Sequence, residues 1–206
     1  MNTLFYIVII FFVGLPFINS SYSNESLEIF SNSKMGIEFN HPSSWILSRD
    51  ETDEQKCEYD CSVSFDISDT GIVPVIVHKY DLNNPLIQSE CICNTLKDFV
   101  KWVYENDFVT KAINLDRDVI SDSPVTINNT LSGWEMESKF EVGLTGKIRQ
   151  NYNFWILHDD VGYFISYTTD EGLQFQKYLP EIKNMIQTIK YIPIEIPQKN
   201  VPSFLQ

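Results

Sequence analysis

The sequence has few positive charges. Its 206 residues include 15 Lys and Arg against 28 Asp and Glu, so the formal net charge is −13 at pH 7. Binding to nucleic acid or to an anionic membrane needs clustered Lys and Arg that replace counterions. The composition therefore excludes nucleic acid as a partner. The excess of acidic residues favours a soluble protein whose surface binds cations or a basic protein.

The residues and motifs that usually carry catalysis are also scarce. The only histidines, His41, His78 and His158, lie in unrelated segments. The sequence contains no phosphate-binding loop, dinucleotide-binding glycine pattern, zinc-protease helix or serine-hydrolase elbow. A serine or cysteine nucleophile would need one of the three histidines as its base. We therefore expect no catalytic residues, no cofactor-binding residues and a non-enzymatic function.

Charge is absent from the first 23 residues. Their centre, Leu4 to Ile18, is apolar over 15 residues, which suits a signal-peptide core and is shorter than the roughly 20 residues of a membrane span. Small residues at positions 21 and 23 predict cleavage after Ser23, so that residues 1–23 are a signal peptide. The mature protein is then secreted or lies at an extracytoplasmic cell surface, without strong membrane insertion. Because the first three residues lack Lys and Arg, an uncleaved N-terminal anchor is the alternative.

Cysteine is rare and confined to one part of the chain. Cys57, Cys61, Cys91 and Cys93 lie within 37 residues, and an even number in an oxidising compartment indicates two disulfides. A disulfide between Cys91 and Cys93, which are only two positions apart, would have a strained geometry. We therefore favour two bridges that join the Cys57/Cys61 segment to the Cys91/Cys93 segment, in either register. A tetrahedral zinc site and free thiols are the alternatives.

The residues that are present predict one domain over residues 24–192, followed by an extended tail over residues 193–206. Residues 36–40 alternate as a strand does, the next four turn the chain at Pro42, and Trp45 then anchors a corner in the core. A solvated loop is expected at 48–60 and a polar connection at 83–94. Alternation predicts strands at 61–68, 72–82, 125–128 and 133–142, and a hairpin at 146–169.

Two helices complete the expected elements. Apolar residues at helical spacing predict helices at 95–108 and 178–190. Thr95 and Asp98 resemble a capping box at the start of the first helix, and Pro180 suits the first turn of the second. The order of strands, helix, strands and helix predicts an α+β fold: a mainly antiparallel, twisted β-sheet flanked by helices.

This layout resembles the PsbP-like domain family. The matching segments, in order, are residues 36–45, 95–107, 121–140, 154–169 and 175–190, and together they span about residues 27–192. The resemblance implies an α/β/α sandwich with a twisted antiparallel sheet between helix layers. The family includes extrinsic subunits of the oxygen-evolving complex of photosystem II and exported prokaryotic proteins without an assigned role. It brings no catalytic residues, and the cysteine pairs are not part of its pattern.

Two kinds of candidate site remain. His158, Asp159 and Asp160, at the expected hairpin tip, offer nitrogen and oxygen ligands to calcium or another divalent cation, although turns are rich in Asp for conformational reasons. Asn24 and Asn128 each begin an N-glycosylation pattern, which matters where the host modifies that pattern.

Two functions of different classes follow. The first is an exported, non-catalytic binding or accessory module that docks on a protein or an envelope complex. Its expected contact surfaces are the acidic loop from Asp50 to Asp60 and the hairpin tip from His158 to Asp160. The alternative is an extracytoplasmic small-molecule- or metal-binding domain with a hydrolytic activity built on a pocket.

Overall fold

The structure, a computed structural model, describes residues 26–52, 57, 60–67, 74–106, 117–142 and 145–194. The expected cleavage site, the glycosylation pattern at Asn24, most of the acidic loop and most of the tail lie outside these residues. The strands are β1 (Leu27–Asn32), β2 (Ile37–Pro42), β3 (Ile46–Asp50), β4 (Asp60–Asp66), β5 (Pro74–Asp81), β6 (Arg117–Ile127), β7 (Leu131–Val142), β8 (Lys147–His158), β9 (Val161–Asp170) and β10 (Lys190–Tyr191). The helices are α1 (Pro85–Glu90), α2 (Leu96–Asn106) and α4 (Leu173–Gln187).

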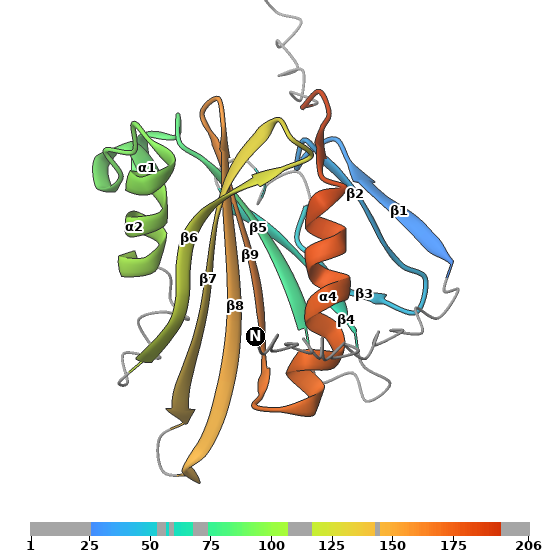
Figure 1. Cartoon of the computed structure of the whole chain (residues 1–206). Helices are drawn as coiled ribbons and strands as arrows, with labels where there is room; N and C mark the ends of the chain where they lie inside the picture. Colours follow the sequence, from blue (N-terminus) through green and yellow to red (C-terminus); the bar gives the residue numbers. More distant parts are fainter. Residues whose placement is uncertain are drawn as a thin grey trace, which may run out of the picture.

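The strands form two antiparallel sheets. The large sheet has the order β3-β4-β5-β9-β8-β7-β6, and the small sheet has the order β1-β2-β10. Helices α1 and α2 lie on one face of the large sheet, and α4 with the small sheet lies on the other (Figure 1). The predicted α+β fold, with a mainly antiparallel sheet between helical layers, is confirmed.

The corner at residues 36–47 carries the chain from the small sheet to the large one. Strand β2 belongs to the small sheet and β3 to the large sheet. The Trp45 amide donates to the Pro42 carbonyl over 3.0 Å, which closes the turn. The Trp45 side chain is only 3% exposed, so its predicted role as a core anchor is confirmed. Strand β3 continues to Asp50, into the range that we expected to be loop.

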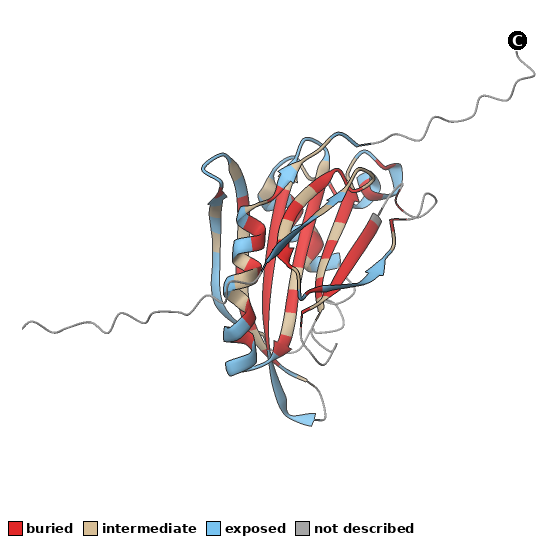
Figure 2. Ribbon diagram, turned by 90° about the vertical axis from the view of Figure 1, so that its right-hand side faces the viewer, coloured by how far each residue is buried: buried red, intermediate tan, exposed pale blue. Residues whose placement is uncertain are grey.

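The large sheet is buried on both faces along its centre, as the red runs in Figure 2 show. On one side, α4 places Phe175 and Ile182 in a core with Phe39 of the small sheet. On the other side, Phe99 of α2 packs with Trp155 of β8. Strand β8 therefore contributes to both cores, which explains why its central residues are continuously buried.

Both helices predicted from apolar spacing are present. At the start of α2, the Asp98 amide donates to Thr95 Oγ1 over 3.2 Å, and the Thr95 amide donates to Asp98 Oδ2 over 3.0 Å. This reciprocal pair confirms the capping box. The short helix α1 was not expected within the polar connection at 83–94. It begins because Asn84 Oδ1 accepts from the Leu86 amide over 2.9 Å and Pro85 takes the first helical position.

The prediction that Pro180 lies in the first turn of the last helix is wrong. Helix α4 begins at Leu173 and holds Pro180 in its interior, where a proline lacks the amide for one helical hydrogen bond and costs about 3 kcal/mol. Pro180 faces solvent, whereas Phe175 and Tyr178 in the preceding turns are buried. Burying two such aromatic side chains contributes about 1.5–3 kcal/mol each, which offsets the proline.

The predicted pairing of cysteines between the two segments is also wrong. The structure joins Cys57 to Cys61 and Cys91 to Cys93. Cys57 and Cys61 pack in the core on the α4 side of the large sheet, whereas Cys91 packs with Phe99 on the α2 side. Because the sheet separates the two pairs, sulfur atoms of different segments cannot meet. Each bridge closes a loop of four residues or fewer, so it restricts the unfolded chain less than a bridge between the segments would.

Among the described residues, no helix combines the length and the apolar character needed to cross a membrane.

Candidate binding groove

A groove lies where the last turns of α4 meet strands β6, β7 and β8. It encloses about 390 Å³, within the range of pockets that bind small ligands or inserted side chains. Its apolar lining comes from Val125, Phe154 and Ile186. Gly133 of β7 helps to form this lining, because a Cβ atom there would collide with the Phe154 ring. The absence of a side chain thus lets the ring lie across the neighbouring strand.

Polar groups converge in the groove on one carboxylate. Glu135 Oε2 accepts a hydrogen bond from the Tyr152 hydroxyl over 2.9 Å and one from Lys183 Nζ over 3.0 Å. Lys183 Nζ also lies 5.0 Å from the centroid of the Tyr152 ring, within cation–π range. Thr126 and Gln187, both exposed, complete the polar lining. The arrangement offers a carboxylate, an ammonium and a phenol around an apolar floor.

Strand register and the length of α4 bring these groups together. In the β7–β8 pair, Glu135 lies opposite Phe154 and Glu137 lies opposite Tyr152. Glu135 and Tyr152 are therefore diagonal neighbours on one face, within reach of long side chains. Helix α4 crosses this face and supplies Lys183. Sequence reasoning missed this site, although Glu135 stands in a predicted strand and Lys183 in a predicted helix, because neither pattern says that the two elements are neighbours.

The ionisation of Tyr152 limits what the groove can do chemically. Burial raises the pKa of the Tyr152 phenol, and the charge of Glu135 and its hydrogen bond raise it further. The hydroxyl therefore stays protonated near neutral pH and donates to the carboxylate. A protonated phenol cannot act as a general base, and Glu135 and Lys183 are paired with each other. The carboxylate, the ammonium and the phenol are thus held in place by one another.

The three residues of the predicted hairpin tip do not converge on one point, although His158 Nε2 lies 3.7 Å from Asp159 Oδ2. The His158 ring stacks on Tyr191, with 3.7 Å between the ring centroids. Asp160 Oδ2 accepts from Asn83 Nδ2 over 3.0 Å, and Asp159 is exposed at a positive φ of 51°. Within the described part of the chain, the tip included, no three His, Cys, Asp or Glu side chains form a group that could hold a metal ion.

Asn128 lies beside the groove. It begins the β6–β7 turn with a φ of 49°, and its amide donates to Gln187 Oε1 over 3.3 Å. Its side-chain nitrogen, to which a glycan would be attached, donates to the Ile189 carbonyl over 3.4 Å. Glycosylation at Asn128 stays a prediction, and a glycan there would stand at the rim of the groove.

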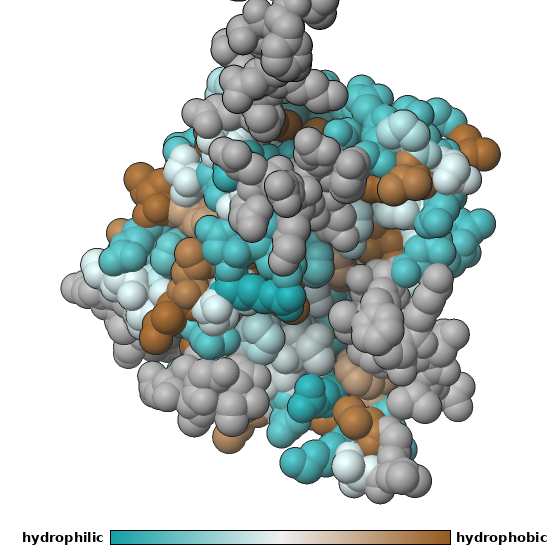
Figure 3. Space-filling view, turned by 180° about the vertical axis from the view of Figure 1, so that it is seen from behind, coloured by the Kyte–Doolittle hydropathy of each residue, from teal (hydrophilic) through white to brown (hydrophobic). Residues whose placement is uncertain are grey.

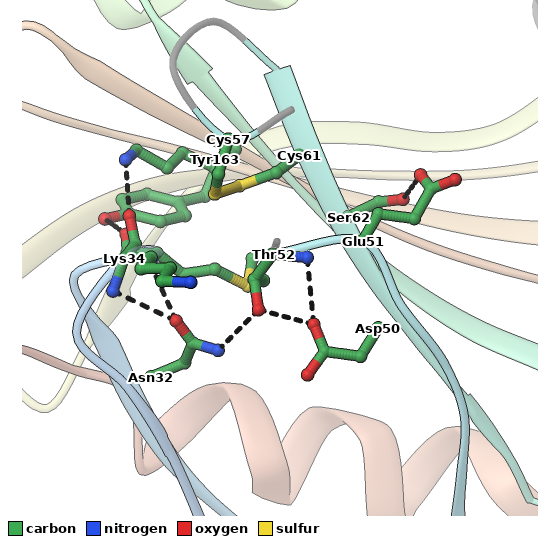
Figure 4. The surroundings of a disulfide bond; sticks show 11 residues. Asn32, Lys34, Asp50, Glu51, Thr52, Cys57, Cys61, Ser62 and Tyr163 are labelled. Carbon is green, nitrogen blue, oxygen red and sulfur yellow. Dashed lines mark hydrogen bonds between the residues drawn. A yellow bond between two sulfur atoms is a disulfide. The ribbon is translucent and has the colours of Figure 1, made fainter. Parts of the chain in front are cut away.

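A second buried polar cluster surrounds the Cys57–Cys61 bridge and has a structural role (Figure 4). Lys79 Nζ donates to the Lys34 carbonyl over 2.6 Å, and the Tyr163 hydroxyl donates to the Met35 carbonyl over 2.6 Å. Burial lowers the pKa of Lys79 and raises that of Tyr163. Lys79 on β5 and Tyr163 on β9 are cross-strand partners in the large sheet. Their hydrogen bonds to the Lys34 and Met35 carbonyls attach the β1–β2 turn to that sheet.

The exposed apolar side chains do not offer a competing site. On the side opposite to Figure 1, brown apolar residues lie in several separate places among hydrophilic ones (Figure 3). The exposed large apolar residues include Leu27 and Ile29 on β1, Ile46 on β3, and Leu86 and Ile92 around α1. Residues scattered in this way are normal for a folded protein. The groove, with its apolar lining and converging polar groups, is therefore a better candidate site than these exposed side chains.

Comparison with known proteins supports the fold. No model of a protein family matches the chain, and no curated protein does. Among solved structures, cyanobacterial PsbP from Synechocystis matches 83% of this chain and 95% of its own, with 15% identity and a TM-score of 0.55. The chain has the PsbP-like fold. The fold relationship predicted from the order of the sequence segments is therefore confirmed.

Two further structures are similar. The Ran-binding protein Mog1p of Saccharomyces cerevisiae matches 82% of this chain and 97% of its own, with 9% identity and a TM-score of 0.51. A protein from Bacteroides thetaiotaomicron has 16% identity and a TM-score of 0.49, over 80% of this chain and 48% of its own. This chain thus spans about half the length of the Bacteroides protein. At identities as low as those of PsbP and Mog1p, the similarity is evidence for the fold alone.

Proposed function

We propose that this protein is an exported, non-catalytic binding module that docks on a partner protein through the groove between α4 and strands β6–β8. The observation that carries the proposal is the convergence of Tyr152 and Lys183 on Glu135 above an apolar floor. Binding sites typically combine such a floor with a few oriented polar groups.

The size of the groove supports a protein partner that inserts one or two side chains. A volume of about 390 Å³ holds a large side chain but not a folded element. Protein interfaces commonly derive most of their affinity from a few such anchors, surrounded by contacts that exclude water. Thr126 and Gln187 are exposed at the rim, where they would form part of that surrounding contact.

The similar structures support a binding role at the level of the fold. Mog1p is a Ran-binding protein, and the PsbP-like family resembled by the sequence includes extrinsic subunits of a membrane complex. The uncharged apolar segment at Leu4 to Ile18 supports export. The chemistry of the groove supports binding without catalysis, because its carboxylate and ammonium are paired and its phenol is protonated.

Site-directed photo-crosslinking in cells of the native host tests the proposal. A photoreactive residue replaces Thr126 at the rim of the groove, or, as a matched control, Lys101 on α2, whose side chain is 74% exposed on the opposite face of the large sheet. We expect a discrete crosslinked partner from position 126 and none from position 101. A Gln187→Trp substitution, which narrows the groove, should remove that crosslink.

Equal crosslinking from both positions, or a crosslink that Gln187→Trp leaves unchanged, would contradict docking through the groove. The partner found at position 126 is then identified by mass spectrometry, purified and titrated with the wild-type protein. An affinity that Gln187→Trp does not reduce in this reconstituted system would contradict the proposal as well.

A further inference from the structure

Lys183 makes the contacts by which proteins recognise a foreign cationic side chain. Its Nζ atom donates to Glu135 Oε2 over 3.0 Å and lies 5.0 Å from the centroid of the Tyr152 ring. A carboxylate beside an aromatic face is a common receptor for the ammonium of Lys or the guanidinium of Arg. In this groove the receptor is occupied by a side chain of the same protein.

Lys183 can leave this position without disturbing the fold. Its side chain is 44% exposed and stands on the helix beside the exposed Gln187. A lysine stem is flexible and its ammonium is readily hydrated, so a rotation of the stem moves the charge into solvent. An ion pair of this exposure contributes little to stability. The cost of opening the receptor is correspondingly small.

The receptor remains organised when Lys183 moves away. The Tyr152 hydroxyl still donates to Glu135 Oε2 over 2.9 Å and so holds the carboxylate in place. The Tyr152 side chain is only 2% exposed, and its β8 backbone lies between β7 and β9 in the sheet. Departure of Lys183 would thus uncover a fixed ring and a fixed carboxylate.

We infer that the Glu135 carboxylate and the Tyr152 ring form a receptor for an Arg or Lys side chain of the partner protein, and that Lys183 occupies this receptor until the partner displaces it. The inference rests on the proposed function of the groove and adds the chemistry of its partner. The net charge of −13 attracts a basic partner over long range. An arginine fits best, because its planar guanidinium pairs with a carboxylate through two hydrogen bonds and stacks on aromatic rings.

Displacement has a consequence that distinguishes a receptor for a cationic side chain from a receptor for an acidic one. Lys183 and the partner's cation compete for one position, so removing Lys183 should strengthen binding. The same substitution also takes a positive charge from the groove and leaves Glu135 unneutralised. A groove that recognised an acidic side chain through Lys183 would respond in the opposite direction.

The test is a titration of the full-length protein with two capped tripeptides, acetyl-Gly-Arg-Gly-amide and acetyl-Gly-Glu-Gly-amide, followed by NMR shifts of the backbone amides of Lys183 and Gln187. We expect the arginine peptide to bind more tightly than the glutamate peptide. Lys183→Ala should tighten arginine binding about threefold, because it removes a competing ion pair that is itself weak. Glu135→Gln should weaken arginine binding about tenfold, as expected for one charge-assisted hydrogen bond. Lys190→Ala, which breaks the exposed pair with Glu38 on the small sheet, is the matched control and should change neither affinity.

Weaker arginine binding by Lys183→Ala, preference for the glutamate peptide, or equal responses of all variants would overturn the inference. Thermal unfolding of each variant shows that the fold is kept; Ala at position 183 favours the helix. If the crosslink from position 126 persists while the arginine peptide fails to bind, the receptor inference fails and the proposed function stands. Loss of the crosslink contradicts the proposed function itself.

Discussion

The tip of the β8–β9 hairpin and the groove both gather charged side chains, but they do so in different ways. At the tip, His158, Asp159 and Asp160 are consecutive in the chain, yet the first stacks on Tyr191 and the third binds Asn83. In the groove, Glu135 is 17 positions from Tyr152 and 48 from Lys183, yet both donate to the same carboxylate oxygen.

Proximity in sequence is therefore a poor guide to which side chains converge in a tight turn. At the tip, His158 lies beside Asp159, but Asp160 has a different partner, because the backbone reverses within a few residues. Diagonal neighbours on adjacent strands share one face of the sheet, and a helix that crosses this face can add a third group. A site built in this way has a fixed geometry, because its side chains stand on strands and a helix.

The electrostatic setting of the two regions also differs. In the groove, burial and Glu135 raise the pKa of Tyr152. Near the tip, burial and then the charge of Asp159 raise the pKa of Tyr191 to about 12. Tyr152 has its hydroxyl partner in the groove, whereas Tyr191 interacts with the tip through its ring, which stacks on His158. Because the Tyr152 ring is buried and the His158 ring is half exposed, substitutions in the two regions should change the free energy of unfolding by very different amounts.

The largest expected effect is that of Tyr152→Ala. The ring is almost fully buried between the sheet and Lys183, so its removal should lower the free energy of unfolding by about 3–5 kcal/mol. His158→Ala at the tip, where the ring is half exposed, should cost about 0.5–1.5 kcal/mol through the lost stacking on Tyr191. Urea unfolding measures both. Equal costs would show that the tip is as well packed as the groove.

A smaller effect is expected from Tyr152→Phe at alkaline pH. Because the folded-state pKa of Tyr152 is raised, the phenol loses its proton in the unfolded chain above about pH 10 but keeps it in the folded protein. The contribution of the protonated Tyr152 phenol to the free energy of unfolding is thus fully present below about pH 10 and is lost as the pH rises further. Above pH 10, the wild type should lose about 1.4 kcal/mol per pH unit more than Tyr152→Phe.

This comparison of alkaline slopes isolates Tyr152, because Tyr163, Tyr167 and Tyr191 also have raised pKa values and are present in both proteins. Urea unfolding at several pH values between 9 and about 11 gives the two slopes. Identical slopes would mean that Tyr152 ionises in the folded protein as easily as in the unfolded chain, and would remove the argument that it acts only as a donor.

The smallest effect is expected from the double substitution Asp159→Asn and Asp160→Asn. Both side chains are at the surface, and the amide oxygen introduced at position 160 can still accept from Asn83, so the free energy of unfolding should change by no more than about 0.5 kcal/mol. Crosslinking from position 126 should also be unchanged, because we propose that the partner docks in the groove. If the double variant folds but loses the crosslink from position 126, the partner contacts the tip, which is one of the two contact surfaces expected from the sequence.

The main strands, the two longer helices and their order could be predicted from the sequence, whereas the short helix α1 could not. The alternation in β2, the capping box of Thr95 and Asp98, and the long hairpin are local patterns, because a strand or a helix repeats its apolar positions within a few residues. These patterns led to the α+β fold and to its resemblance to the PsbP-like domain. The start of α4 was missed because the burial of Phe175 outweighs the local cost of Pro180.

Which elements are neighbours, and on which face of the sheet each side chain lies, followed from the tertiary structure. It separated the two cysteine pairs, because the large sheet lies between the core of Cys61 and that of Cys91. It also built the groove, because strand register and the course of α4 bring Glu135, Tyr152 and Lys183 together. Register and packing depend on contacts between distant residues, and these contacts leave no periodic trace in the sequence.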